Sequence, residues 1–524
     1  MPSFAPTPPG ILEFQPKLHI MMPFSTPIRS FALALAVTFA APAQESFQQV
    51  QSRISEFTLA NGMKFIVLER HQAPVASFYT YVDAGSAQEK TGLTGLAHMF
   101  EHMAFKGTST IGTKNYSEEK NSLDRVDAAF KSLQRERDRG RSADPEAIKK
   151  LEGEFKAAQD TAGQFVVSNE FGTAIEQAGG RGLNASTASD KTDYFFSLPS
   201  NSAELWFFLE SERFRDPVFR EFYKERDVVM EERRMRTDSN PIGKAVEEFL
   251  AVAYKAHPYG QPTIGHMSDL QNLTRKDAVD FFKTYYQPSN MIVSIVGDVD
   301  PKEMKRLAET YFGRIPTASK PEPVRTVEPP QEFERRVTVR LNAQRLFILG
   351  FHKPGTDDPD HAVYATLGSI LSDGRSSRLD TALVQQKKLA VNAFGGPGFP
   401  GEKYPNLFLF GAFTAPGKTN EELEKAMLAE IERLKTEPVT KEELDGVKTR
   451  FRAGLIKQFN DNTQMAGQLA EWQALTGNWK NLFLYLQKLE KVTPDDIQRV
   501  AKATFTPGNR TIAVIEPIET AEAK

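Results

Sequence analysis

The chain has 524 residues, of which 40% are apolar and 25% charged, and its formal net charge is −3. This length predicts more than one domain, and the near-neutral charge gives no reason to expect nucleic acid or an anionic membrane as a partner. There is no cysteine, which excludes disulfides, thiol catalysis and cysteine-ligated zinc, so any metal must be held by His, Asp or Glu.

The first stretch of the chain predicts export. Arg29 precedes the apolar run 31–40, and Ala41-Pro42-Ala43 follows it as an A-x-A cleavage pattern. Because that run is too short to span a bilayer, we interpret residues 1–43 as a leader and signal peptide cleaved near Ala43. No later stretch is long and apolar enough to anchor the mature chain, so we expect a periplasmic or secreted protein without a membrane span.

Strands and then a helix are expected next. From Phe57 the sequence alternates as strands do, and Asn61-Gly62 between two such runs predicts a hairpin. A further strand is expected over 75–83. Three glycines then lead into a helix that begins after Gly95 and is apolar on most of its sides.

This helix carries His98 and His102 four residues apart, with Glu101 between them. Residues i and i+4 share a helix face, so both imidazoles can reach one ion, and Glu101 lies beside that face. Two histidines, a third protein ligand and a water are typical of catalytic zinc. The H-x-x-E-H pattern reverses the H-E-x-x-H of ordinary zinc proteases. It predicts a metal site rather than two core histidines one turn apart, because polar residues suit so apolar a helix only when paired.

A charged segment over about 117–166 has apolar residues at helical spacing. Asp144-Pro145 within it is typical of a helix start, with an N-cap followed by proline at the first helical position. We expect a helical hairpin with one apolar stripe that packs on its parent domain. Gating of the active site, or docking of a partner, is the alternative role.

The later part of the chain contains a repeat. Residues 274–296 match residues 493–515 without a gap, and each copy reads as a helix, a turn and a buried strand. The identical pairs are Thr274/Thr493, Asp277/Asp496, Lys283/Lys502, Pro288/Pro507 and Asn290/Asn509. A common helix–turn–strand module is the alternative to a duplication, but identities held in one register favour duplication.

The repeat predicts an α+β fold with two homologous domains, each an antiparallel-rich sheet covered by helices, and the helical hairpin inserted in the first. We place the domains at 52–316 and 332–518, joined by a proline-rich linker over 317–331. Only the first domain contains the histidine pair. The second is therefore expected to be catalytically silent.

The residues alone leave the third zinc ligand open. A helix is expected from Tyr223, and the candidates on it are Glu225, Glu231 and Glu232. Glu225 and Glu232 are two helical turns apart and share a face, whereas Glu231 points about 100° away from Glu232.

Three stretches together resemble a known family: His98-x-x-Glu101-His102, Asn184-Ala185 and Glu225-Arg226-x-Val228-x-x-x-Glu232. The pattern is similar to that of the insulinase (pitrilysin) family of inverted-motif zinc peptidases, in the subfamily of mitochondrial processing peptidase and its bacterial relatives. The separation of the two metal-binding stretches exceeds the family norm by about the length of the helical hairpin. We therefore interpret the hairpin as an insertion that leaves the site intact.

The resemblance implies a role for each matching residue. Glu232 would be the third ligand of one zinc ion per chain, Glu225 would support the site from outside the ligand set, and Glu101 would be the general base. Asn184 and Ala185 match the edge strand on which a peptide substrate lies as an added strand. For Asn184 a plain turn-to-strand connection is the alternative.

The second domain departs from the family pattern. The family offers an Arg and, seven residues later, a Tyr after a Ser-Arg-Leu helix start, but Val384 and Val391 stand at those positions here. Valine can neither donate a hydrogen bond to an oxyanion nor bind a carbonyl. The resemblance therefore implies the metal-bearing subunit of a dimer, either a homodimer or a heterodimer with a relative that supplies the Arg/Tyr pair.

The sequence thus predicts a zinc-dependent endopeptidase that hydrolyses peptides or unfolded polypeptide segments. The alternative is a non-catalytic core or chaperone-like subunit of the same fold, which the presence of both histidines, Glu101 and Glu232 disfavours. A metal-binding protein without hydrolysis is a third hypothesis. Glu101 disfavours it, because a pure binding site has no use for an unpaired carboxylate beside the metal.

Overall fold

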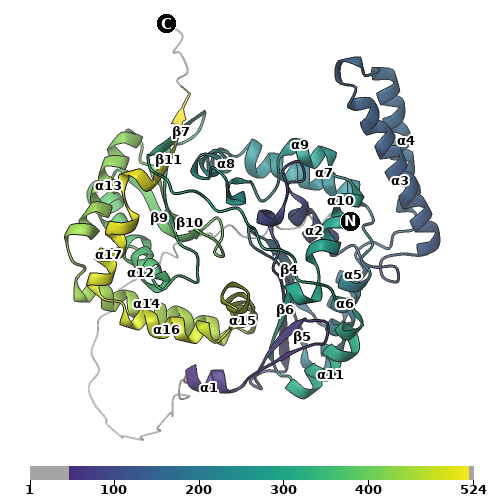
Figure 1. The fold of residues 1–524 in the computed structure, drawn as a ribbon, viewed down its shortest axis with the longest axis horizontal. Coiled ribbons are helices and arrows are strands. Elements are labelled where there is room, and N and C mark those ends of the chain that lie inside the picture. The colour runs from purple at the N-terminus through teal and green to yellow at the C-terminus, as the bar shows by residue number, and fades with distance from the viewer. Residues whose placement is uncertain (1–46, 519–524) are drawn as a thin grey trace, which may run out of the picture. The chain divides into compact units, whose positions relative to one another are not determined.

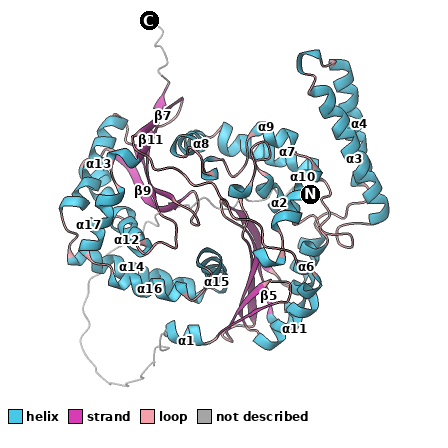
Figure 2. Cartoon of the chain, viewed as in Figure 1, coloured by secondary structure: helices cyan, strands magenta, loops and turns pink. Residues whose placement is uncertain are grey.

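The structure is a computed structural model that describes residues 47–518. Helices pack on two β-sheets, one completed by residue 297 and the other beginning at residue 335 (Figures 1 and 2), which confirms the predicted α+β class. The predicted leader and signal peptide, residues 1–43, lie outside the described residues. Within the described part, no helix has both the length and the apolar character needed to cross a bilayer.

Each sheet is named here from edge to edge. The first runs β1 (Ile54–Thr58), β2 (Lys64–Glu69), β6 (Met291–Gly297), β3 (Val75–Val82), β5 (Thr192–Pro199) and β4 (Arg181–Thr187). The second runs β7 (Arg335–Leu341), β11 (Arg510–Pro517), β8 (Leu346–Lys353), β10 (Asn406–Thr414) and β9 (Ala390–Phe399). The hairpin predicted at Asn61-Gly62 is the antiparallel pair β1–β2.

The helices fall into two series. The first half of the chain, which contains the first sheet, contributes α1 (Phe47–Ser52), α2 (Leu96–Met103), α3 (Tyr116–Arg137), α4 (Pro145–Gly163), α5 (Glu170–Gln177), α6 (Ala203–Arg215), α7 (Phe222–Arg233), α8 (Pro241–Ala253), α9 (Met267–Asn272), α10 (Arg275–Tyr285) and α11 (Pro301–Tyr311). The second half contributes α12 (His361–Ser372), α13 (Asn420–Thr436), α14 (Lys441–Asn460), α15 (Asn462–Thr476), α16 (Asn481–Lys491) and α17 (Pro494–Thr504).

The two sheets share one strand order. In the first, β6 lies parallel to β2 and antiparallel to β3. In the second, β11 lies parallel to β7 and antiparallel to β8. Two further antiparallel strands follow in each, β5 and β4 in the first and β10 and β9 in the second. The predicted homology of the two halves is therefore visible in their topology.

The repeated segments also share their local interactions. Thr274 and Thr493 each cap a helix, α10 and α17, in a capping box with the Asp three residues later. Asn290 and Asn509 each donate the side-chain amide to two backbone carbonyls, one at the end of the preceding helix and one on or beside the neighbouring strand. These shared contacts explain why the identical residues lie where the helix turns into the strand.

Each half covers a sheet of the other. Helix α15, from the second half, packs on β3 and β6 of the first sheet, and a Cβ at Gly467 would lie 3.1 Å from the Tyr79 ring. Helix α8, from the first half, packs on β7 and β11, where Phe249 contacts Gly350 so closely that a Cβ there would lie 2.6 Å from its ring. The apolar cores of the two halves are therefore mutually dependent.

The proline-rich segment over 317–331 contains no helix or strand, but it is held by contacts to both halves. The Glu328 carboxylate accepts backbone N–H groups of residues 255–257 at 2.7–2.9 Å. The Val324 amide donates to the Tyr404 hydroxyl at 3.2 Å. These bonds attach the segment to the end of α8 and to the loop before β10.

The predicted helical hairpin is the pair α3–α4, which extends outward beside α7 in Figure 1. Asp144 caps α4 by accepting the amide of Glu146, and Pro145 occupies its first turn as predicted. Phe130 of α3 and Phe155 of α4 pack against each other with ring centroids 5.3 Å apart. Both also contact the Tyr223 ring of α7.

The mutual covering of the sheets predicts a large effect for Phe249→Ala. Phe249 is 0% exposed, and its removal leaves a cavity between α8 and the second sheet, so we expect a loss of about 3–5 kcal/mol in the free energy of unfolding. Phe208→Ala, on the 39% exposed side chain of α6, is the matched control and should lose far less. Urea unfolding followed by tryptophan fluorescence measures both, and equal losses would contradict the assignment.

Candidate metal centre

The first turn of α2 is held by a residue that lies before it in the sequence. Gly95 precedes the helix with φ 91°, a left-handed conformation that favours glycine, and it has no side chain with which to cap the helix. The buried Glu89 carboxylate replaces such a cap, because it accepts the amides of Gly95 and Ala97 at 2.8 and 2.7 Å. This bond pair orients the helix that carries His98 and His102.

The second group of site residues comes from α7. Glu225 and Glu232 both face α2, as their two-turn spacing predicts, and each carboxylate approaches His102. Glu231 points elsewhere, with its side chain 59% exposed and paired with Arg234 at 2.8 Å. The α-helix ends at Arg233, and a π-helical turn continues to Asp238.

His98, His102 and Glu232 lie together. Glu232 Oε2 is 3.6 Å from His98 Nε2 and 3.6 Å from His102 Nε2, and one ligand atom of each residue lies within 4.8 Å of the others. Among residues 47–518, this is the only such group of three His, Asp or Glu residues. The other oxygen of Glu232, Oε1, forms an ion pair with Arg236 at 2.8 Å.

This donor set fits a zinc ion. Tetrahedral zinc with bonds of about 2.0–2.2 Å to nitrogen and oxygen separates its ligand atoms by roughly 3.3–3.6 Å, which is close to the separations of Glu232 from the two imidazoles. His102 Nδ1 lies 3.4 Å from Glu225 Oε2. A carboxylate in that place holds the imidazole with Nδ1 protonated and leaves Nε2 free for a metal. His98 Nδ1 is buried and has no hydrogen-bond partner among the described residues.

The charges of the two histidines differ. Burial, together with the neighbouring His102, lowers the pKa of His98 to about 4, so this imidazole is neutral at pH 7. Burial alone would also lower the pKa of His102, but the Glu225 and Glu232 carboxylates outweigh it and raise that pKa to about 9. Burial alone would raise the pKa of Glu225, but His102 and Lys106 outweigh it and lower that pKa to about 2.

Glu101 lies on α2 one residue before His102, and its side chain is half-buried. Burial raises its pKa above the ordinary value for a glutamate. A carboxyl group with a raised pKa is suited to accept a proton and then to release it near neutral pH.

Asn184 and Ala185 lie on β4, at the edge of the first sheet. β4 pairs only with β5, with Asn184 opposite Phe195 and Ala185 opposite Tyr194, so its other backbone edge has no strand partner among the described residues. Ala185 is buried and Asn184 is exposed. Helix α2 packs against β4.

The two valines of the second half lie in different surroundings. Val384 is half-buried in a π-helical segment, Asp380–Gln386, and Val391 on β9 is 56% exposed. Neither offers a polar group. The nearby Arg378 guanidinium is already paired with Glu443, at 2.8 and 3.0 Å.

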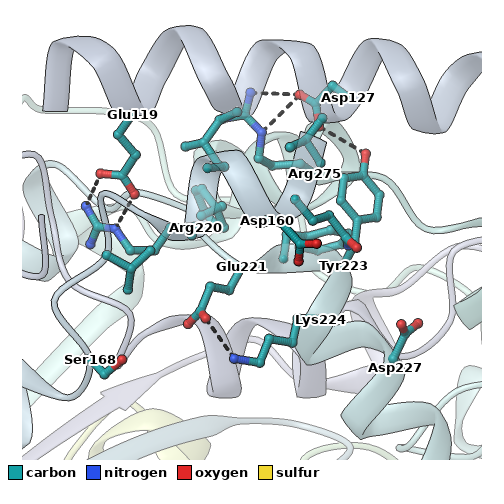
Figure 3. A pocket seen from close by; sticks show the side chains of 18 residues that line it. Glu119, Asp127, Asp160, Ser168, Arg220, Glu221, Tyr223, Lys224, Asp227 and Arg275 are labelled. Atoms are coloured by element: carbon teal, nitrogen blue, oxygen red, sulfur yellow. Dashed lines mark hydrogen bonds and ion pairs between the residues drawn. The ribbon is translucent and has the colours of Figure 1, made fainter. Parts of the chain in front are cut away.

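Arg220 was not singled out by sequence reasoning, yet it joins three elements. Its guanidinium, 1% exposed, pairs with Glu119 of α3 at 2.7 Å (Figure 3) and donates to the backbone carbonyls of Lys106, Thr108 and Ile111 in the loop after α2. That loop leaves room for the guanidinium at two glycines, where a Cβ would lie within 3 Å of it. The contact sets the start of α7 against the end of α2.

The α3–α4 hairpin packs on the face of α7 opposite the metal centre. Tyr223 donates to Asp127 at 3.0 Å, and Asp127 also pairs with Arg275 at 2.7 Å, as Figure 3 shows. The Arg226 guanidinium lies over the Phe130 ring, 4.6 Å from its centroid. A cavity of about 530 Å³ remains between the hairpin and α7.

Two family models match the chain. The one described as "Insulinase (Peptidase family M16)" matches residues 64–134 and 163–266, and the one described as "Peptidase M16 inactive domain" matches residues 272–451. The first model leaves out residues 135–162, which contain the tip of the helical hairpin and most of α4. Most of α3 (Tyr116–Arg137) lies within the match, so only the second part of the hairpin falls outside the family model.

Curated relatives match over most of the chain. The "Zinc protease PqqE" of Helicobacter pylori is 31% identical over 468 residues, which cover 88% of this chain and 92% of the relative. The "Probable mitochondrial-processing peptidase subunit beta" of Schizosaccharomyces pombe is 24% identical and covers 88% of this chain and 91% of the relative.

Solved structures also match. A protease from Helicobacter pylori superposes with a TM-score of 0.74 at 27% identity, covering 88% of this chain and 99% of that one. A peptidase M16 inactive domain from Pseudomonas fluorescens superposes with a TM-score of 0.71 at 16% identity, covering 89% of this chain and 98% of that one. The second likeness is one of fold alone.

The histidine charges predict that zinc binding at about pH 7.5 releases roughly one proton per ion. With a pKa of about 9, His102 is protonated at that pH and must lose its proton to bind through Nε2, whereas His98 is already neutral. The apparent affinity should therefore rise about tenfold per pH unit and level off above pH ~9. Calorimetric titration in buffers of different ionisation enthalpy measures the release.

The control for this titration is Glu225→Gln, which removes a carboxylate that raises the pKa of His102. This variant should release fewer protons at the same pH. Equal proton release by the two proteins would show that Glu225 does not set the charge of His102.

Proposed function

This chain belongs to the insulinase family (peptidase family M16), and on that premise we propose that it is a zinc-dependent endopeptidase acting on peptides or unfolded polypeptide segments. The observation that supports the proposal is the grouping of His98, His102 and Glu232 within 4.8 Å, beside the half-buried Glu101. Curated relatives that match most of the chain are named zinc proteases.

In this proposal His98, His102 and Glu232 hold one zinc ion. When bound, zinc polarises the scissile carbonyl and lowers the pKa of water, which makes a nucleophile available at neutral pH. Glu101 accepts the proton of the attacking water and delivers it to the nitrogen of the leaving amine. Burial raises the pKa of Glu101 above its ordinary value, which favours acceptance of the proton.

Glu225 acts on the metal centre through His102. Its Oε2 faces His102 Nδ1 at 3.4 Å, so it fixes the ring orientation and the tautomer that presents Nε2. Because its own pKa is low, Glu225 remains charged throughout the pH range in which a peptidase works.

The substrate lies as an added strand along β4, at Asn184 and Ala185. Main-chain pairing on a free sheet edge requires an extended peptide but makes few demands on its side chains. Peptides and unfolded segments adopt this extended form most readily, which is why we propose them as substrates. Since β4 lies beside α2, a peptide on this edge passes the metal ligands.

We further propose that the chain works after export, as the metal-bearing subunit of a dimer. Val384 and Val391 leave the second half without a polar group at the positions where the family has Arg and Tyr. A relative that carries the Arg/Tyr pair would complete the site, whereas a second copy of this chain has the same two valines. The match of residues 272–451 to an inactive-domain model also favours a second candidate function, that of a non-catalytic core or chaperone-like subunit.

Glu101→Gln is expected to lower peptide hydrolysis by about 10²–10⁴-fold while zinc stays bound. The amide keeps the shape of the carboxylate but cannot accept the proton. Cleavage of a quenched fluorescent peptide library, together with zinc content by mass spectrometry, measures both effects. Glu231→Gln, on the exposed face of α7, is the matched control. Retention of full activity by Glu101→Gln would remove Glu101 from the mechanism.

The missing Arg/Tyr pair predicts low activity for the chain alone and a gain on mixing with a relative that has the pair. Size-exclusion chromatography of an equimolar mixture, with peptide cleavage assayed on each fraction, measures complex formation and activity together. The control is the same mixture with Glu101→Gln in this chain. If the mixture forms no complex and shows no added activity, the divided site is contradicted and the non-catalytic subunit is favoured.

A further inference from the structure

We propose that Lys106 and Glu221 are positioning residues of the metal centre, which together hold the Glu225 carboxylate against His102. The inference rests on the proposed zinc site and concerns residues outside its ligand set. Neither residue is a candidate ligand, and sequence reasoning did not identify either one.

A series of contacts connects Glu221 and Lys106, through Glu225, to the candidate metal ligand His102. Lys106 Nζ lies 2.6 Å from Glu225 Oε1 and 3.1 Å from Glu221 Oε2. The other oxygen of Glu225 faces His102 Nδ1 at 3.4 Å. Each oxygen of Glu225 therefore has one partner, and the ammonium group decides how the carboxylate is turned toward the imidazole.

His102 has no other support of this kind. Within the described residues, Glu225 is the hydrogen-bond partner of His102 Nδ1, and His98 Nδ1 has none. If Glu225 rotates away, the His102 ring can turn and carry Nε2 from its place 3.6 Å from Glu232. The orientation of one of the two imidazoles then depends on Lys106.

The backbone at Glu221 is held in an unfavourable conformation that preserves this contact. Glu221 precedes α7 with φ 56°, in the left-handed region that residues with a side chain rarely adopt. Short side chains at this position, such as Ser, Thr, Asp and Asn, usually accept an amide of their own helix, but the Glu221 side chain makes no such bond. Its two oxygens reach Lys106 and Lys224 instead; Figure 3 shows the pair with Lys224.

Burial distinguishes this cluster from ordinary surface ion pairs. The side chains of Lys106, Glu221 and Glu225 are 21%, 18% and 14% exposed. The Glu231–Arg234 pair is 59% and 48% exposed, and such pairs contribute little. A half-buried ammonium between two carboxylates, by contrast, restricts both of them.

The placement of Lys106 is itself fixed. It follows α2, and its backbone carbonyl accepts a hydrogen bond from the buried Arg220 guanidinium, whose residue directly precedes Glu221. The backbones that carry Lys106 and Glu221 are thereby joined. The fold therefore places these two side chains together, and their contact is not a chance approach of two long side chains.

The test compares Lys106→Met with Lys224→Met, using zinc ion alone as the probe. Both changes remove an ammonium that pairs with Glu221, but only Lys106 bonds Glu225. Zinc affinity is measured by competition with a chelating indicator. We expect Lys106→Met and Glu221→Gln to bind zinc about 10–100-fold more weakly, Lys224→Met to bind like the unmodified chain, and Lys106→Arg to recover most of the loss.

A second readout reports on His102 directly. Nitrogen-15 NMR of metal-free protein labelled at histidine, recorded at a pH above the pKa of His102 so that the ring is neutral, distinguishes the two imidazole tautomers. In Lys106→Met the His102 signals should move toward those of an averaged, unrestrained ring, and in Lys224→Met they should not. Circular dichroism melting of each metal-free variant shows whether it is folded.

The outcomes separate the two proposals. If the unmodified chain binds no zinc, the proposed function fails. If it binds zinc and Lys106→Met binds within twofold of Lys224→Met, with the same His102 signals, the positioning role is overturned and the zinc site stands. Should Lys106→Met not fold, the comparison of Glu221→Gln with Lys224→Met decides the matter by the same criterion.

Discussion

Arg220, whose guanidinium is almost completely buried, donates at once to Glu119 of α3 and to three carbonyl oxygens of the loop that follows α2. Burying an arginine is unfavourable unless its donors are satisfied, so these elements can pack only in the arrangement that satisfies them. That arrangement brings the start of α7 to the end of α2. The metal centre depends on it, because His98 and His102 come from one helix and Glu232 from the other.

The helical hairpin extends this support to the back of α7. Tyr223 and Arg226 lie on the face of α7 away from the metal centre and contact Asp127 and Phe130 of α3. The hairpin thus contacts α7 from behind while α2 lies in front of it, and a cavity of about 530 Å³ remains between the hairpin and α7. The contacts of the hairpin lie behind the candidate site rather than within it, so the hairpin leaves the candidate ligands in place.

The second half of the chain contributes to the first without supplying a metal ligand. Helix α15 covers the face of the first sheet that α2 does not, and α8 in return covers part of the second sheet. Removing either half would expose an apolar sheet face to water, which is strongly unfavourable. This mutual covering gives a physical reason for a half without a candidate metal ligand to persist.

The sequence by itself determined the features that depend on local geometry. The histidine pair, the shared face of Glu225 and Glu232, the capped hairpin and the repeated helix–turn–strand segment follow from helical periodicity and from short-range capping. Only the tertiary structure decided that Lys106, Glu221, Arg220 and Glu89 lie around the candidate metal centre and that the two halves exchange covering helices. Those contacts join residues far apart in the sequence, or depend on one left-handed backbone position, and no local pattern of residue types records which distant side chains a fold brings together.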